Sequence, residues 1–538
     1  MSASREKKQR QVLKEQGIAP QQLAAQAAAK KRRKNRTIAA IVIVLVLAVA
    51  VTGVYFGLIQ PNRAVKTSTA LQVGDHALTP VDMSFYYMDT VYQFYNQYGS
   101  YLSYVLDTTK SLDAQYYDED KNITWADHFQ EEAAKNAATS YALYDDAVAQ
   151  GMSLSDEQKT SLDKEIENLK SALSSNENFK NFDDYLAKTY GKGCDEDAYR
   201  QYRQVQLLAS QFSSDYTDSL TYSDEEVNDT YQADPQKYTA VTYRSFYVSK
   251  SYFAQDTAED ATDEEKTAAD EAALAQAEEK AKEMTEACKG DEAAFAQWAR
   301  DIVPETSQAT YADDDATLTT ESSYDNASSY GRDWLYADDR QAGDTAYFEA
   351  DGNGYYVYYF IATSDNDYAT VNARQILVSV TNDTDSDGDG TNDTISDEAW
   401  QTAKNKADEL LQQWRDGDAT EDSFGELAKT SSADSTTSTN GGLVENLSHN
   451  NFGDERDAWC YDTQRKPGDC EIIKTDSGYA ILYYVGPGEN RRANLIRTDL
   501  KNDAYTSWYE GYQSKYTYEF GSGMKYVNTD ITLTSSQS

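Results

Sequence analysis

An internal duplication between residues 238 and 488 is the feature that most restricts how this chain can fold. The segment AVTYRSFYVS at 240–249 aligns with TVNARQILVS at 370–379, and both alternate residue types with the period of a strand. In both copies an acidic stretch and an amphipathic helical pattern follow, and then a Gly-Asp turn and an aromatic strand. The repeated order predicts two copies of one α/β unit, at 238–366 and 367–488.

Charge and hydropathy separate two further segments at the N-terminus. Residues 1–36 contain eleven Lys and Arg but only two Glu, and residues 37–59 form an uncharged run rich in Val, Ile and Leu. This run is long enough to cross a bilayer as a helix. It is also longer than the apolar part of a cleaved signal peptide, which is the alternative. Because basic residues stay on the cytoplasmic side, the sequence predicts a single-pass anchor with its N-terminus in the cytoplasm.

The remainder of the chain is acidic enough to give the whole protein a net charge of −42. Nucleic-acid partners need Lys and Arg for contacts to phosphate, so a nucleic-acid partner is excluded. The sequence therefore predicts an acidic extracytoplasmic body that one helix holds at the cell membrane.

Residues 65–237 have the pattern of a helical domain. Thr79-Pro80 is a helix start signal, and Ser223 with Glu226 matches a capping box. The tail at 489–538 also begins with a helical pattern. Because an isolated helix must bury its apolar face, we expect the tail to pack on the helical domain.

Aromatic residues between positions 85 and 104 recur at helical spacing. This spacing favours a helix core, with an exposed aromatic surface that binds extended chains as the alternative.

Four cysteines are too few for a disulfide scaffold in a chain of this length. Cys460 and Cys470 are near enough in sequence to form a disulfide. The spacing does not give the geometry of the bond, so the pairing is left open.

The second copy contains the opening strand ARQILV, the helix ending FGELAKTSSAD, the motif Gly441-Gly442-Leu443 and the closing KPGDCEIIKTDSGYAILYYV. In these motifs it resembles a parvulin-type peptidyl-prolyl isomerase domain. The flanking segments VGDHALTPVDMSFYYM and YSDEEVNDTYQADPQKY resemble PrsA/SurA-type extracytoplasmic foldases. The resemblance implies an α+β fold. In it a transmembrane helix precedes a helical chaperone-like domain that the C-terminal helix completes, and two parvulin-like α/β domains are inserted.

The resemblance implies a membrane-anchored foldase or chaperone that binds unfolded or nascent secreted proteins and requires no cofactor. Two alternatives stand beside it. One is a catalytically active peptidyl-prolyl isomerase, and the other is a calcium-dependent surface interaction protein.

Parvulins place one histidine in the first strand, an acidic residue or cysteine after the helix, and a second histidine in the last strand. By this resemblance Asp434 is the acidic residue, but the histidine positions hold other residues. The fold is therefore expected to persist with weakened isomerase activity. The substituted positions are Gln375 and Ala480 in the second copy and Ser245 and Tyr356 in the first.

The resemblance assigns substrate contacts in the second copy to Leu443, Phe452 and Trp459, with Asp434 and Gln375 as the catalytic candidates. Other roles compete with these assignments. Asp434 is equally of the type that forms turns and caps. Trp459 has a counterpart, Trp334, at the same place in the first copy, which favours core packing.

The acidic stretch of the second copy has the spacing of a calcium-binding loop. Alternate carboxylates followed by a glycine place several oxygens around one point, which is the arrangement that Ca²⁺ prefers. A full EF-hand would have Glu where Ser396 stands, so modest affinity is expected, and a solvated acidic loop is the alternative. The predicted ligands are Asp385, Asp387, Asp389, the carbonyl of Thr391, and Asp393.

Overall fold

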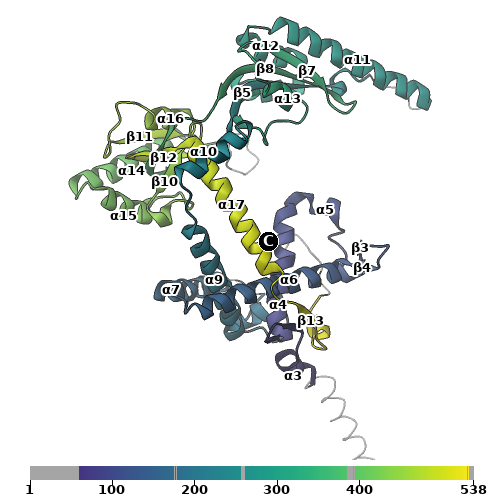
Figure 1. The fold of residues 1–538 in the computed structure, drawn as a ribbon, viewed down its shortest axis with the longest axis vertical. Coiled ribbons are helices and arrows are strands. Elements are labelled where there is room, and N and C mark those ends of the chain that lie inside the picture. The colour runs from purple at the N-terminus through teal and green to yellow at the C-terminus, as the bar shows by residue number, and fades with distance from the viewer. Residues whose placement is uncertain are drawn as a thin grey trace, which may run out of the picture. The chain divides into compact units, whose positions relative to one another are not determined.

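The computed structural model of the protein describes residues 60–531, except residues 175, 177, 256, 257, 259, 260, 385–391, 393 and 530. Contacts divide the chain into two units. The first comprises the residues up to Leu220 together with those from Ala504 onward, and the second is Thr221–Asp503. Figure 1 shows the helices and strands of both units.

The predicted anchor at 37–59 and the basic tail at 1–36 lie outside the described residues. Within the described part of the chain, no helix combines the length and the apolar character that crossing a membrane requires. Membrane attachment therefore stays a prediction from the sequence.

The first unit is mainly helical. At the start of its helix α4, the side chain of Thr79 accepts from the backbone N–H of Asp82. In return the Asp82 carboxylate accepts from the N–H of Thr79 at 2.8 Å. Short strands form a sheet of order β13-β1-β2 and a pair β3-β4. The elements are α3 (Gln60–Thr67), β1 (Leu71–Val73), β2 (His76–Leu78), α4 (Pro80–Tyr98), α5 (Leu102–Val105), β3 (Tyr116–Asp118), β4 (Ile123–Thr124), α6 (Trp125–Ala149), α7 (Asp156–Leu173), α8 (Phe182–Thr189), α9 (Glu196–Ser219) and β13 (Tyr518–Phe520).

The core of the first unit lies where α4 packs against α6 and α9. Small buried side chains of α6, such as Ala133, allow the aromatic side chains of α4 to approach closely. Phe85 and Tyr87 are fully buried, whereas Tyr101 and Tyr104, beyond the end of α4, are 70% and 86% exposed. The predicted aromatic core is thus confirmed for α4, and the end of the aromatic run is exposed.

The C-terminal segment contributes to the first unit. Strand β13 pairs antiparallel with β1. In the second half of α17 (Arg491–Gln513), the Trp508 ring stacks on Tyr216 of α9 with centroids 4.3 Å apart. The first half of α17 belongs to the second unit, where Ile496 is buried against Val227 and Tyr238.

The second unit contains two four-stranded antiparallel sheets of the same topology. Their strand orders are β6-β5-β8-β7 in repeat one (238–366) and β10-β9-β12-β11 in repeat two (367–488). Ser245 lies opposite Tyr358, and Gln375 lies opposite Leu482, so the strand registers correspond as well. The duplication that the sequence predicts is therefore present in the strand order and register.

The strands of the second unit are β5 (Ala240–Ser249), β6 (Leu318–Ser323), β7 (Thr345–Glu349), β8 (Gly354–Ser364), β9 (Ala369–Ser379), β10 (Leu443–Leu447), β11 (Cys470–Thr475) and β12 (Gly478–Asn490). The helices, besides the first half of α17, are α10 (Asp224–Ala233), α11 (Asp263–Ala287), α12 (Glu292–Ile302), α13 (Arg332–Leu335), α14 (Asp397–Asp416), α15 (Glu421–Ser431) and α16 (Asp454–Cys460).

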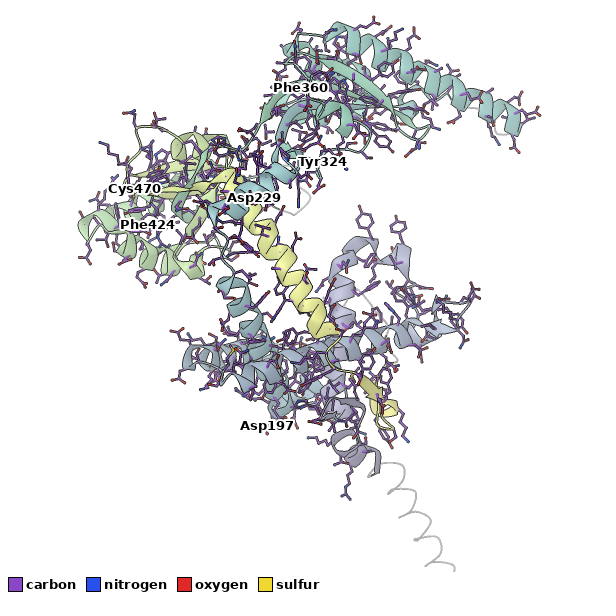
Figure 2. All side chains as sticks on the ribbon, viewed as in Figure 1. Asp197, Asp229, Tyr324, Phe360, Phe424 and Cys470 are labelled. Carbon is purple, nitrogen blue, oxygen red and sulfur yellow. The ribbon has the colours of Figure 1, made fainter. Side chains whose placement is uncertain are left out.

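Each sheet is covered by two helices on one face: α11 and α12 in repeat one, and α14 and α15 in repeat two. In repeat two, Phe424 of α15 is fully buried beside Ile376 and Ile481 of the sheet (Figure 2). A second apolar cluster, which includes Trp459 and Ala480, lies on the opposite face of the sheet. This face, which α14 and α15 do not cover, is the open face. The residues that the sequence assigns to the isomerase site belong to this open face.

The two cysteines of repeat two are unpaired. Cys460 belongs to the cluster on the open face of the sheet, whereas Cys470 packs against the cluster under α14 and α15. The sheet thus separates the thiols, so the disulfide that the spacing left open does not form. Burial raises the pKa of each thiol to about 12, which keeps both protonated near neutral pH.

An arginine ties the first strand to the second helix in both repeats. Arg244 Nε donates to Glu292 Oε1 at 3.0 Å, and Arg374 Nε donates to Glu421 Oε1 at 3.0 Å. Arg374 also donates from Nη1 to the carbonyl oxygen of Gly441 at 3.0 Å. These bonds hold β9, α15 and the glycine turn together, and this framework carries the candidate site.

Candidate functional site

The candidate site lies on the open face of the sheet in repeat two. Gln375 points to this face from the middle of β9, and only 8% of its surface is exposed. Fully buried Ala480 and Leu482 of β12 belong to the same apolar face. A buried carboxamide in such surroundings requires hydrogen-bond partners.

The double-glycine motif holds β10 tightly against β9. The backbone N–H of Gln375 donates to the Gly442 carbonyl at 2.8 Å. Gly442 has φ +73°, and a Cβ atom there would lie 2.2 Å from the Gln375 carbonyl oxygen. Glycine is therefore required at position 442, because its backbone lies too close to that of Gln375 for a side chain to fit. The same close approach fixes the backbone of Gln375.

Asp434 follows the end of α15 and lies against Gln375. Gln375 Nε2 donates to Asp434 Oδ2 at 2.6 Å, and the Thr437 hydroxyl donates to the same oxygen at 2.6 Å. The backbone N–H of Thr436 donates to Oδ1 at 3.0 Å. Burial raises the pKa of Asp434, but these hydrogen bonds outweigh burial, so its pKa lies below the ordinary value.

The lowered pKa of Asp434 predicts a pH dependence of stability. Because its pKa is lower when folded than when unfolded, the bonded carboxylate stabilises the domain above pH of about 4. This contribution disappears as pH falls through the folded-state pKa. In acid titrations of chemical denaturation, Asp434→Asn should therefore lose less stability between neutral and acidic pH than the native chain. Equal slopes would contradict the prediction.

Phe452 and Arg456 complete the cluster from the start of α16. The Arg456 guanidinium lies 4.9 Å from the centre of the Phe452 ring, and its Nη1 donates to Gln375 Oε1 at 3.4 Å. Asp434, Gln375, Arg456 and Phe452 thus form one continuous chain of contacts. Arg456 was not among the predicted site residues, because no local pattern in the sequence indicates which strand the start of α16 faces.

A cavity of about 340 Å³ opens beside Phe452 and Arg456. Its other wall is the turn between β11 and β12, including Lys474 and Ser477. Phe452 lines this cavity, and its contact with substrate stays a prediction. The residues that line the cavity are Phe452, Gly453, Glu455, Arg456, Lys474, Thr475, Asp476 and Ser477.

Leu443 and Trp459 do not line this cavity. Trp459 is only 6% exposed, its Nε1 donates to Glu471 Oε2 at 2.8 Å, and the Arg465 guanidinium lies 4.2 Å from its ring centre. Trp459 is therefore a core residue, as the alternative interpretation held. Leu443 is half-buried at the start of β10, opposite Arg374.

The corresponding face of repeat one is filled by aromatic rings. Tyr356 occupies the position of Ala480, and Tyr358, fully buried, occupies that of Leu482. The Tyr330 ring stacks on Tyr356 with centroids 5.3 Å apart. A Cβ atom on Gly331 would lie 2.4 Å from the Tyr358 ring. In repeat one, tyrosine side chains therefore occupy the positions that correspond to the candidate site of repeat two.

The family model of the PPIC-type PPIASE domain matches residues 355–485. The chain contains a parvulin-type isomerase domain. The match begins in β8 and extends through β9, β10 and β11 into β12, so repeat two is the parvulin-type domain of this chain. The resemblance seen in the sequence is confirmed.

Solved structures similar to the chain include PrsA from Bacillus subtilis, at 11% identity over 73% of this chain and 87% of that chain, with a TM-score of 0.28. Peptidylprolyl isomerase PrsA from Bacillus anthracis is 20% identical over 28% of this chain, with a TM-score of 0.18. This chain spans 59% of that protein's length.

A SurA-like chaperone structure from Campylobacter jejuni is 12% identical over 66% of this chain and 82% of that chain, with a TM-score of 0.16. The TM-scores are low, and no property of these proteins is carried over. No curated protein matches the chain.

The predicted calcium ligands Asp385, Asp387, Asp389, Thr391 and Asp393 lie outside the described residues. Among the residues that the structure describes, no three His, Cys, Asp or Glu side chains are grouped to hold a metal. Thr384 and Thr394 form an antiparallel bridge, so the two ends of this loop lie side by side.

Calcium binding by this loop stays a prediction. Titration calorimetry of the full chain should show saturable heat at millimolar Ca²⁺, because the carboxylates supply the oxygen ligands that this ion requires. The double variant Asp387→Ala/Asp389→Ala should abolish the heat. Unchanged heat in that variant, or none in the native chain, would contradict the prediction.

Proposed function

We propose that this protein is a membrane-anchored extracytoplasmic foldase that binds exposed segments of unfolded exported proteins. The observation that carries the proposal is the cluster of Phe452, Arg456, Gln375 and Asp434 beside an open cavity of about 340 Å³. It lies in a parvulin-type domain that has no imidazole at either usual position. The domain serves to hold a prolyl segment more than to isomerise it.

The chemistry of the cluster supports binding. The Phe452 ring offers apolar contact to a proline ring, and the Arg456 guanidinium supplies N–H donors for a peptide carbonyl. Prolyl isomerisation requires more, because the amide barrier is about 18–20 kcal/mol and falls only when polar groups stabilise the twisted bond. The side-chain amide of Gln375 already donates a hydrogen bond to Asp434, and the side chain of Ala480 contributes no polar group.

The anchor and its orientation are part of the proposal. The uncharged run 37–59 and the basic segment 1–36 support attachment to the cell membrane with the body outside. Protease added to intact cells should digest the body. A body that resists external protease but is digested after lysis would refute the extracytoplasmic location.

A client-aggregation assay tests the foldase. The full chain in lipid nanodiscs should suppress the aggregation of a chemically denatured client at equimolar amounts. Phe452→Ala should weaken suppression, whereas Phe520→Ala, which removes a 44%-exposed phenylalanine in the other unit, should not. Full-strength aggregation in the presence of the native chain would refute the proposal.

An active isomerase is the second candidate, and the match of residues 355–485 to the PPIC-type family favours it. A proline-peptide isomerisation assay with an Asp434→Ala control separates the two. We expect rates near the uncatalysed reaction, which takes tens of seconds or longer. Strong acceleration that Asp434→Ala removes would establish the isomerase instead.

A further inference from the structure

A second cavity lies within the first unit, among α4, α6, α9 and the second half of α17. Its volume is about 200 Å³, and its lining is almost entirely polar. Three carboxamides, Gln93, Asn136 and Gln206, contribute to it, and Tyr509 closes one side. The parvulin-type domain, in the other unit, contributes no residue to this cavity.

The cavity contains a hydroxyl without a hydrogen-bond partner. Tyr86 is 4% exposed, and its hydroxyl has no partner within the described chain. Burial raises the pKa of Tyr86, and the side chains of Ser140 and Gln206 oppose that rise. A buried hydroxyl without a protein partner is destabilising, so at a cavity wall the Tyr86 hydroxyl is available to pair with water or with a bound group.

Among the residues that the structure describes, Asp89 is the only charged one that lines this cavity. Its Oδ2 accepts from the Tyr202 hydroxyl at 2.5 Å, and burial raises its pKa despite that bond and the charge of Arg203. Arg203 itself is paired with Glu165 at 2.9 Å. Among the described residues, no Lys or Arg forms an ion pair with Asp89, so the charge of Arg203 acts on this carboxylate only without direct contact.

The lining therefore matches a positively charged group that can donate several hydrogen bonds. Asp89 supplies the negative charge, and the carboxamide oxygens supply acceptors. The strongly acidic chain also raises the local concentration of cations. We propose that this cavity binds an organic cation, a guanidinium or primary ammonium group carried on a flexible stem.

The same chemistry has two sources, a basic side chain of a polypeptide and a free small amine. Calorimetry of the full chain in nanodiscs should compare ethylguanidinium with ethylurea, its neutral counterpart. It should also compare a glycine-flanked arginine peptide with the same peptide carrying citrulline. Each cation should bind at least about tenfold more tightly than its neutral partner, because only the cation pairs with Asp89.

The measurements with the arginine peptide distinguish the two sources. Binding of ethylguanidinium alone identifies a small amine, and tighter binding of the arginine peptide identifies a polypeptide side chain. Equal affinity for the charged and neutral probes, or no saturable binding of either cation, overturns the proposal. Neither result depends on whether the protein prevents client aggregation, so the proposed function is tested separately.

Variants test the assignment of the residues. Asp89→Asn keeps the shape of the side chain and should reduce cation affinity about tenfold or more. The control Asp197→Asn, which changes an exposed carboxylate of α9, should leave the affinity unchanged (Figure 2). Unchanged binding by Asp89→Asn overturns the site.

Tyr86→Phe separates a ligand contact from a structural role. Removing an unpaired buried hydroxyl should leave the melting temperature unchanged or raise it, while the affinity for ethylguanidinium falls. A lower melting temperature with unchanged affinity would show that the hydroxyl is structural and would remove Tyr86 from the site.

Discussion

Gly442→Ala is expected to destabilise the parvulin-type domain by about 3 kcal/mol or more. The added Cβ would lie 2.2 Å from the Gln375 carbonyl oxygen, which belongs to the backbone of the central strand β9 and cannot rotate away. The left-handed φ of +73° adds strain for any residue with a side chain. Chemical denaturation of the native chain and the variant measures the difference.

Gly453→Ala is the matched control within the same repeat. Gly453 has φ +84°, but an added Cβ there would meet no atom within 4 Å. This variant should therefore lose only about 1–2 kcal/mol, which is the effect of the backbone conformation without a clash. If the two variants lost equal stability, the close approach of β10 to β9 would not be what requires Gly442.

The second large expected effect is the loss of stability when the packing of the tyrosines in repeat one is changed. Gly331→Ala should destabilise repeat one by about 2 kcal/mol, because the new methyl group would overlap the buried Tyr358 ring. Tyr358→Leu, which introduces the residue found at the equivalent position 482 of repeat two, should also destabilise it, by about 2–3 kcal/mol, through the space it leaves.

The double variant Gly331→Ala/Tyr358→Leu gives the decisive comparison. Because the smaller leucine makes room for the methyl group, the two losses should fall short of additivity by about 1 kcal/mol or more. Denaturation of the four chains completes this cycle. Simple additivity would mean that the Tyr358 ring does not occupy the space beside Gly331.

These results would define a division of roles between the repeats. The same strand order and the same arginine–glutamate pair support both sheets. In repeat two the open face carries a polar cluster and a cavity, whereas in repeat one tyrosines hold the positions that correspond to that cluster. A cavity of about 770 Å³ lies beside Leu335 and Tyr336 of repeat one. The residues that the sequence assigned to the isomerase site therefore come together in repeat two.

The sequence predicted what local patterns encode. The alternation at 240–249 and 370–379 predicts strands, and the Ser223–Glu226 box does begin a helix, with Ser223 accepting from the Glu226 N–H. The resemblance named both Gln375 and Asp434 as candidates, and the structure adds that these residues, 59 positions apart, share a 2.6 Å hydrogen bond.

Local sequence patterns could not predict which residues of different strands and helices come into contact. The faces of Cys460 and Cys470 depend on which side of one sheet each element packs, and a ten-residue spacing contains no such information. The same applies to Arg456 at Gln375 and to Asp89 beside Tyr202, since each contact joins elements far apart in the chain.

The sequence by itself therefore determined the duplicated α/β unit, the helical first unit and the loss of both imidazoles, because periodicity, capping and residue identity are local properties. Only the tertiary structure decided that Trp459 is core, that Phe452 lines a cavity, and that a carboxylate with no ion-pair partner among the described residues lies among four helices. Those outcomes follow from packing, in which a side chain's role is set by the neighbours that the fold places around it.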